Sequence, residues 1–181
     1  MKILLLSLPR TGSTSLYTQL CKEHNALGVF NPFDDTGRTS IPWEYKGNLV
    51  VKCGIIYGFT DQERDQRADK FVELAKKFDQ VRFLCRRDFH SHIESLAYLQ
   101  ENNEYDKAAY REETFTSTTK YRYKTPSETR LNAAADTIQT LEYILLKVAA
   151  KLDGTVEYYE DLFDPKGPGR YRQLKQEGRL L

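Results

Sequence analysis

Short apolar runs alternate with longer amphipathic segments along most of this chain. Uninterrupted apolar runs predict buried strands, and these runs span residues 2–7, 26–30, 49–53, 81–85 and 155–159. Recurrence of apolar residues every three or four positions predicts helices, and these lie from residue 13 to His24, over 61–78, over 89–99 and over 131–152. This alternation predicts an α/β fold, a three-layer sandwich with a mainly parallel central sheet.

Three stretches lack such periodicity. Residues 31–47 contain Pro, Gly, Asp and Thr and are predicted to form a loop. Residues 100–126 are polar, and tyrosines alternate there with arginines and lysines. Two interpretations of 100–126 remain open, a lid that closes over a sugar or an anionic acceptor, and a long loop of ordinary composition. The polar tail, 164–181, is expected to be peripheral to a single domain covering 1–181.

Length and composition narrow the class of protein. The 181 residues suffice for one domain with a core of its own. With 27 basic and 26 acidic residues, bulk charge gives no argument for binding nucleic acid or a membrane surface. The cysteines, Cys21, Cys53 and Cys85, are unclustered and lack zinc-site spacing, which favours buried free thiols. The apolar start is too short for a signal peptide or a membrane span, so we expect a soluble, cytoplasmic protein.

The turn between the first strand and the first helix carries the main chemical signal. It contains Arg10 and Gly12 together with four hydroxyl residues, namely Thr11, Ser13, Thr14 and Ser15. Backbone N–H groups of such a turn, with the positive end of the helix dipole, form a site for phosphate. The alternative is an ordinary turn in which Ser13 caps the helix.

A nucleoside-triphosphate loop, G-x-x-x-x-G-K-[ST], fits this turn poorly. Alignment of Gly12 on the second glycine places Ser7 on the first glycine and Ser13 on the lysine. The missing lysine is the group that neutralises the terminal phosphates. A metal-dependent kinase is therefore disfavoured, and it is kept as the runner-up.

Segments in three parts of the chain resemble the sulfotransferases. Residues 9–16 are similar to the 5′-phosphosulfate loop, P-[KR]-[ST]-G-[ST]-T-x-[LW]. Residues 83–88 with Ser95 are similar to the strand-loop-helix segment R-[DN]-P-x5-S, and residues 156–162 resemble the late Tyr-Glu-Asp-Leu strand end. Asn31-Pro32-Phe33 stands where many carbohydrate sulfotransferases have Glu-Pro-aromatic. The resemblance spans residues 3–163 and implies a P-loop NTPase-like fold.

The resemblance implies a metal-independent enzyme that moves a sulfuryl group from 3′-phosphoadenosine 5′-phosphosulfate to an acceptor hydroxyl or amine, leaving 3′-phosphoadenosine 5′-phosphate. Arg10 would contact the bridging oxygen and the 5′-phosphate. Arg87 and Ser95, eight residues apart, would hold the 3′-phosphate, and Lys52 would help to bind the sulfuryl group. The remaining donor-binding groups would be the amides and hydroxyls of Thr11, Gly12, Ser13, Thr14 and Ser15. The partner that the resemblance implies would be a small-molecule or carbohydrate acceptor.

The general base is harder to assign. The chain has Cys53-Gly54 where cytosolic members have a histidine, and Asn31 replaces the acidic residue of Glu-Pro. We therefore predict a loop carboxylate, Asp34 or Asp35, with Glu44 behind them. His90 and His92 are expected at solvated helix positions. A third interpretation is a non-catalytic nucleotide-binding module that has lost its base.

Overall fold

The computed structural model describes residues 1–32, 40–55, 61–101 and 125–163. The chain divides into two compact units, of which the first contains Met1–Arg87 and Gln139–Phe163 and the second contains Asp88–Ile138 and Asp164–Leu181. Each unit is described by itself.

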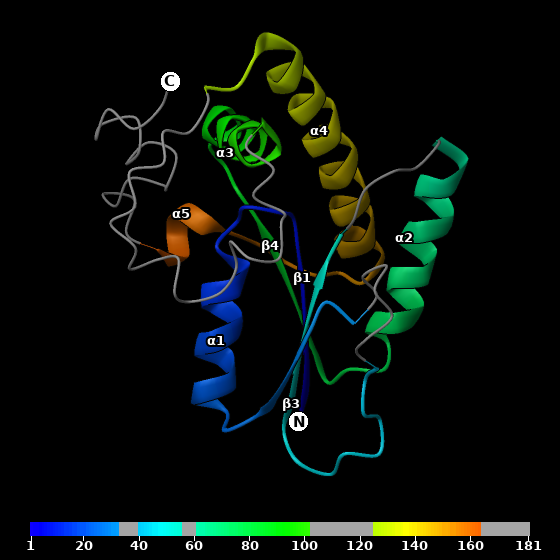
Figure 1. Ribbon diagram of the computed structural model, residues 1–181. Coiled ribbons are helices and arrows are strands. Elements are labelled where there is room, and N and C mark those ends of the chain that lie inside the picture. The colour runs from blue at the N-terminus through cyan, green and yellow to red at the C-terminus, as the bar shows by residue number, and fades with distance from the viewer. Residues whose placement is uncertain (33–39, 56–60, 102–124, 164–181) are drawn as a thin grey trace, which may run out of the picture. The chain divides into compact units, whose positions relative to one another are not determined.

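A parallel β-sheet organises the first unit. Its described strands are ordered β2-β3-β1-β4-β5, and every pair of neighbours is parallel (Figure 1). Their bounds are β1 Lys2–Ser7, β2 Leu27–Phe30, β3 Leu49–Gly54, β4 Gln80–Cys85 and β5 Val156–Tyr158. The central strands are mostly apolar because parallel strands are buried on both faces, with Lys52 of β3 and Arg82 of β4 as exceptions. The structure confirms the predicted α/β class and the parallel sheet.

Alternate side chains of β1 face the two sides of the sheet. Ile3 and Leu5 pack with Leu16 and Leu20 of α1, which spans Ser13–Glu23. This helix ends at a His24 C-cap and Asn25, whose left-handed backbone (φ 45°) terminates the helical path. One face of the sheet is therefore covered by the helix that directly follows the central strand.

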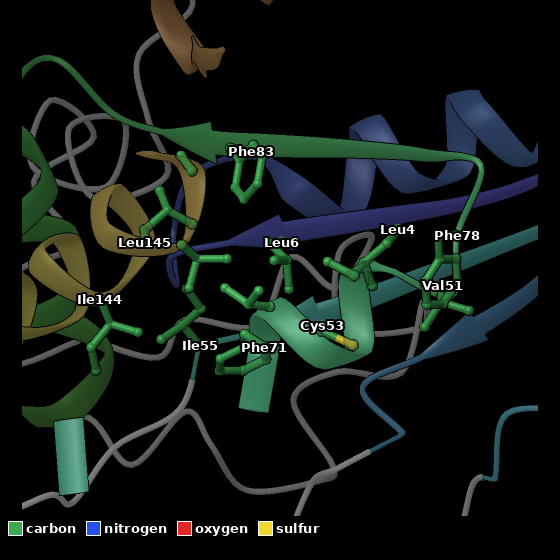
Figure 2. Close-up of a cluster of buried hydrophobic side chains, with 14 of the residues drawn as sticks. Leu4, Leu6, Val51, Cys53, Ile55, Phe71, Phe78, Phe83, Ile144 and Leu145 are labelled. Carbon is green, nitrogen blue, oxygen red and sulfur yellow. The ribbon is translucent and has the colours of Figure 1, made fainter. Parts of the chain in front are cut away.

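The other face of the sheet carries the larger core. Leu4 and Leu6 of β1 pack there against α2, Asp61–Ala75, and against the part of α4, Glu128–Lys151, that belongs to this unit (Figure 2). Phe71 of α2 and Leu145 of α4 are among the buried contacts. Helices on both faces leave the strand ends as the place where loops can form a site.

In the second unit, Asp88 caps the start of α3, Phe89–Glu101. Its Oδ1 atom accepts a hydrogen bond of 2.9 Å from the Ser91 amide, as an N-cap side chain does. His92, one residue further, is 1% exposed. The expectation that His92 is solvated is therefore wrong, whereas the His90 side chain is 81% exposed and lies 3.4 Å from Glu94.

The element bounds differ little from the predicted ones. The largest differences are three residues, at the end of α2, which stops at Ala75, and at the start of α4, which begins at Glu128. The last strand ends at Tyr158, one residue earlier than expected, and leads directly into the short helix α5, Tyr159–Leu162. Cys53 and Cys85 are buried and Cys21 is half-buried. No helix within the described ranges has the length and apolar character needed to cross a bilayer.

Candidate functional site

The loop after β1 contains two residues with unusual backbone conformations. Arg10 and Gly12 both have left-handed backbones, with φ of 62° and 71°. Thr11 is fully buried, and its hydroxyl donates to the Leu8 carbonyl at 2.8 Å, which holds the loop in this shape. A non-glycine residue such as Arg10 in this region is strained, and such strain is common at functional positions.

Helix α1 starts from Gly12, which is its N-cap, and not from Ser13. The expectation that Ser13 caps the helix is therefore wrong, because the cap lies one residue earlier. A glycine cap brings no side chain to the first amides of the helix, which have no partner further back in the helix. The Ser15 amide is an exception, because it donates to the Gly12 carbonyl at 3.0 Å. The Ser13 and Thr14 amides are thus the best placed of the predicted amide donors.

Lys52 adds a cation beside this loop. Its Nζ atom lies 3.5 Å from the Thr14 hydroxyl and 3.9 Å from the centre of the Phe30 ring. Only 7% of Lys52 is exposed, and this burial lowers its pKa from 10.5 to about 8. The predicted position of Lys52 near the loop agrees with the structure, while the Cys53 side chain belongs to the core on the opposite face of the sheet.

A second cationic group lies where β4 ends. The Arg87 guanidinium makes two hydrogen bonds to the Asp161 carboxylate, at 2.9 and 2.8 Å, and stacks over the Tyr158 ring at 4.5 Å. The Arg87 amide donates to Glu160 Oε2 at 2.9 Å. Asp161 raises the pKa of Arg87, and Arg87 in turn lowers the pKa of the Asp161 carboxyl. These contacts join the end of β4 to α5.

Aromatic side chains of the C-terminal segment pack against the loop. A Cβ atom at Gly12 would lie 2.7 and 2.8 Å from two ring atoms of Tyr159 and 3.1 Å from the Phe163 ring. The Tyr159 ring also lies beneath the Arg86 guanidinium, at 5.1 Å. Glycine is therefore required at position 12 for two reasons, its positive φ and its contact with Tyr159.

These contacts bring three separate segments to one edge of the sheet. They are the loop after β1, the end of β4, and the β5–α5 turn, which are the segments that the sequence resemblance singles out. The carboxyl ends of strands in a parallel sheet form such a ligand-binding edge. A shallow hollow of ≈ 490 Å³ runs from this edge along α1, lined by Thr14, Ser15, Thr18, Gln19, Lys22 and Glu23.

The structure does not bring every predicted residue to this edge. Asp34 and Asp35 lie outside the described residues, so their role stays a prediction. Ser95 is buried on α3 in the second unit, whereas Arg87 is in the first, so their convergence on one phosphate also stays a prediction.

The structure removes Glu44 from the candidate bases. The carbonyl of its neighbour Trp43 accepts a hydrogen bond of 2.9 Å from Lys2 Nζ at the amino end of β1, and the Trp43 ring packs against Phe78, which precedes β4. The loop follows the other end of β1, and six strand residues separate the two ends by about 20 Å. Glu44 is exposed at the wrong edge of the sheet.

Asn31 has a structural role instead of an acid–base one. Its Oδ1 atom accepts the Gly54 amide at 3.0 Å, and its own amide donates to the Lys52 carbonyl at 2.8 Å. These two bonds hold the β2–β3 pair together beyond the last paired residues, with Asn31 in the left-handed region (φ 44°). Asn31 therefore orients the strand that carries Lys52.

Sequence reasoning noted the segment 156–162 but assigned no site role to Tyr159, Glu160 or Asp161. The signal that identifies them is their position, because they follow the last strand of a parallel sheet directly.

Among the described residues, no group of three or more His, Cys, Asp or Glu side chains is arranged to hold a metal ion. Comparison of the chain with protein-family models, curated proteins and solved structures found no match.

Proposed function

We propose that this protein is a sulfotransferase that uses 3′-phosphoadenosine 5′-phosphosulfate as donor and belongs to the P-loop NTPase-like folds. One observation carries the proposal. The three segments that resemble sulfotransferase motifs are up to about 150 residues apart, and they meet at the carboxyl edge of one parallel sheet. A parallel sheet brings its strand ends to one edge in any case, and the support for the proposal is that each of these three converging segments carries a sulfotransferase-like motif.

In the proposed reaction, the acceptor oxygen or nitrogen forms a bond to sulfur while the bond from sulfur to the 5′-phosphate oxygen breaks. The acceptor proton passes to a base, for which Asp34 and Asp35 stay the candidates. Charge accumulates on the departing phosphate, so the main task of the protein is positioning and neutralisation.

The residues of the loop suit that task. Arg10 and the Ser13 and Thr14 amides would neutralise the 5′-phosphate. The Thr14 and Ser15 side chains are exposed, so their hydroxyls are accessible for further hydrogen bonds. Lys52, 3.5 Å from the Thr14 hydroxyl, would contact the sulfuryl group. Arg87, with Ser95, would take the 3′-phosphate.

The test is a calorimetric titration with 3′-phosphoadenosine 5′-phosphate in EDTA, with ATP titrated in parallel. We expect metal-free binding that favours the 3′-phosphorylated nucleotide. Arg10→Ala and Arg87→Ala should each abolish donor-dependent transfer and leave the thermal unfolding transition in place. Lys76→Ala, at an exposed lysine paired with Glu73, is the matched control and should retain activity. Preference for Mg-ATP would refute the proposal and favour the small-molecule kinase.

A second candidate, a nucleotide-binding module without catalysis, is favoured by the bonding of Asn31. The residue at the Glu-Pro position has no carboxylate, and its side-chain oxygen accepts a backbone amide. This candidate predicts the same nucleotide binding but no sulfuryl transfer to phenols, sugars, amines or peptide tyrosines. Turnover of labelled donor with any acceptor in that panel would exclude it.

A further inference from the structure

We propose that Asp161 is an internal competitor for the 3′-phosphate of the donor, occupying the guanidinium of Arg87 until the nucleotide displaces it. This inference rests on the proposed function and concerns the regulation of that same site. It makes Asp161 a determinant of donor affinity and of selectivity for a 3′-phosphorylated nucleotide.

The Asp161 carboxylate binds the Arg87 guanidinium in the geometry that an anionic ligand would adopt. The two Arg87–Asp161 hydrogen bonds run from both terminal nitrogens to both carboxylate oxygens, at 2.9 and 2.8 Å. The planar guanidinium that matches a carboxylate in this way matches two phosphate oxygens equally well. The Asp161 carboxylate therefore uses the donor groups that a phosphate would use.

The pair is exposed enough to exchange. The Arg87 and Asp161 side chains are 57% and 55% exposed, so an incoming anion reaches them from solvent. Exposed ion pairs generally contribute little net stability, and a bidentate arginine–carboxylate pair such as this one lies at the upper end of their range. A phosphate dianion that is also held elsewhere through the same nucleotide can therefore replace the carboxylate.

Arg87 is also held by contacts that do not involve Asp161. Glu160 accepts the Arg87 amide at 2.9 Å, and the Tyr158 ring lies 4.5 Å from the guanidinium. These contacts keep Arg87 at the site when Asp161 releases it. Since α5 also carries Tyr159 against Gly12, the residue that competes for the 3′-phosphate and the residue that covers the 5′-phosphate loop belong to one helical turn.

Competition has a defined consequence for selectivity. A nucleotide without a 3′-phosphate does not need the Arg87 guanidinium, so Asp161 leaves its affinity unchanged. A nucleotide with a 3′-phosphate must displace the carboxylate, and part of its binding free energy offsets the lost ion pair. Removal of the carboxylate charge therefore strengthens binding of the second ligand alone.

The experiment compares 3′-phosphoadenosine 5′-phosphate with adenosine 5′-phosphate by calorimetry on the full chain. Asp161→Asn should bind the 3′-phosphorylated nucleotide roughly 2- to 10-fold more tightly than the wild type, with adenosine 5′-phosphate unchanged. Asp161→Ala should shift affinity in the same direction, which guards against a fold defect peculiar to one variant. Asp69→Asn, at an exposed carboxylate paired with Lys151, is the matched control and should shift neither affinity.

The outcomes separate this inference from the function on which it rests. If the wild type prefers the 3′-phosphorylated nucleotide and Asp161→Asn binds it equally or more weakly, the competitor role is overturned and the proposed function stands. If the wild type shows no such preference, the proposed function fails and the competitor role fails with it. An Arg87→Ala, Asp161→Asn double variant should lose the gain, because the gain requires the guanidinium.

Discussion

The contact between Gly12 and the Tyr159 ring allows a substitution whose effect can be worked out from the structure. Gly12→Ala adds one methyl group to a residue with φ of 71°. The left-handed region costs an alanine about 1–2 kcal/mol relative to glycine. The new Cβ atom would also lie 2.7 and 2.8 Å from carbons of the Tyr159 ring, well inside the ordinary contact distance of about 3.5–4.0 Å.

The Tyr159 ring is half-buried and has neighbours that oppose its movement away from that methyl group. It packs on the Phe163 ring at 5.0 Å between centres and lies beneath the Arg86 guanidinium. Overpacking of this kind costs about 1–3 kcal/mol. Together with the backbone strain, we expect Gly12→Ala to lower the free energy of unfolding by about 2–5 kcal/mol. For a chain of this length that corresponds to a fall in Tm of roughly 5–15 °C.

Urea denaturation followed by circular dichroism measures this change. Gly47→Ala is the matched control, because its added Cβ atom would meet the Tyr45 ring at 2.7 Å, but that ring is 43% exposed and can rotate into solvent. In a background with both Tyr159→Ala and Phe163→Ala, Gly12→Ala should cost only the backbone part, about 1–2 kcal/mol. A cost below about 0.5 kcal/mol in the wild-type background, or one equal to that of Gly47→Ala, would refute the reasoning.

Two further predictions follow from buried or half-buried charges. Because burial lowers the pKa of Lys52 from 10.5 to about 8, the unfolded chain binds more protons between those pH values, and the contribution of Lys52 to stability rises with pH across that window. Lys52→Met should therefore raise the free energy of unfolding at pH 7 by up to about 3 kcal/mol, and this gain should shrink toward pH 10. Urea titrations at pH 7 and pH 10 measure the gain, and a gain that is the same at both pH values would contradict the prediction. The Glu157 carboxylate accepts two hydrogen bonds from Arg82 and so connects the edge strand β5 to β4. Glu157→Gln should lower the free energy of unfolding by about 1–2 kcal/mol. Unaltered amide exchange across Val156–Tyr158 in this variant would show that the pair does not hold the strand.

The strands were predictable because burial on both faces leaves a local signature. The runs at 2–7, 49–53 and 81–85 are almost wholly apolar, and their observed bounds differ from the predicted ones by one residue at most. The last strand was predicted one residue too long at its end. Tyr159 fits a strand locally, but it begins α5, where its ring packs against Gly12 from the other end of the chain. A contact at that separation leaves no mark in the local pattern.

The buried His92 was predictable from its neighbours. His92, Leu96 and Leu99 are spaced four and three residues apart, which places them on one helix face, and all three are buried. The residue type favoured a solvated position, and the spacing favoured the core. Here the spacing was the better guide.

The candidate site was predictable only in part. The loop at 9–16 could be recognised in the sequence by its glycine, arginine and hydroxyl residues. The Arg87–Asp161 pair could not be recognised in this way, because the two residues are 74 positions apart and their contact depends on β5 lying beside β4. Sequence order does not specify that arrangement, since the neighbours of β4 are β1 and β5.

The chain positions of Gly12 and α5 bear on how the protein matures during synthesis. During synthesis the loop leaves the ribosome about 150 residues before Tyr159 and Asp161, a delay of about 7–30 s at typical elongation rates. Until then the loop has neither its aromatic cover nor the carboxylate at Arg87, and β4 is an unpaired edge. The aromatic contact of the loop and the second neighbour of β4 therefore form only after residues 156–161 have emerged, so the described five-stranded sheet is completed late in synthesis of this segment.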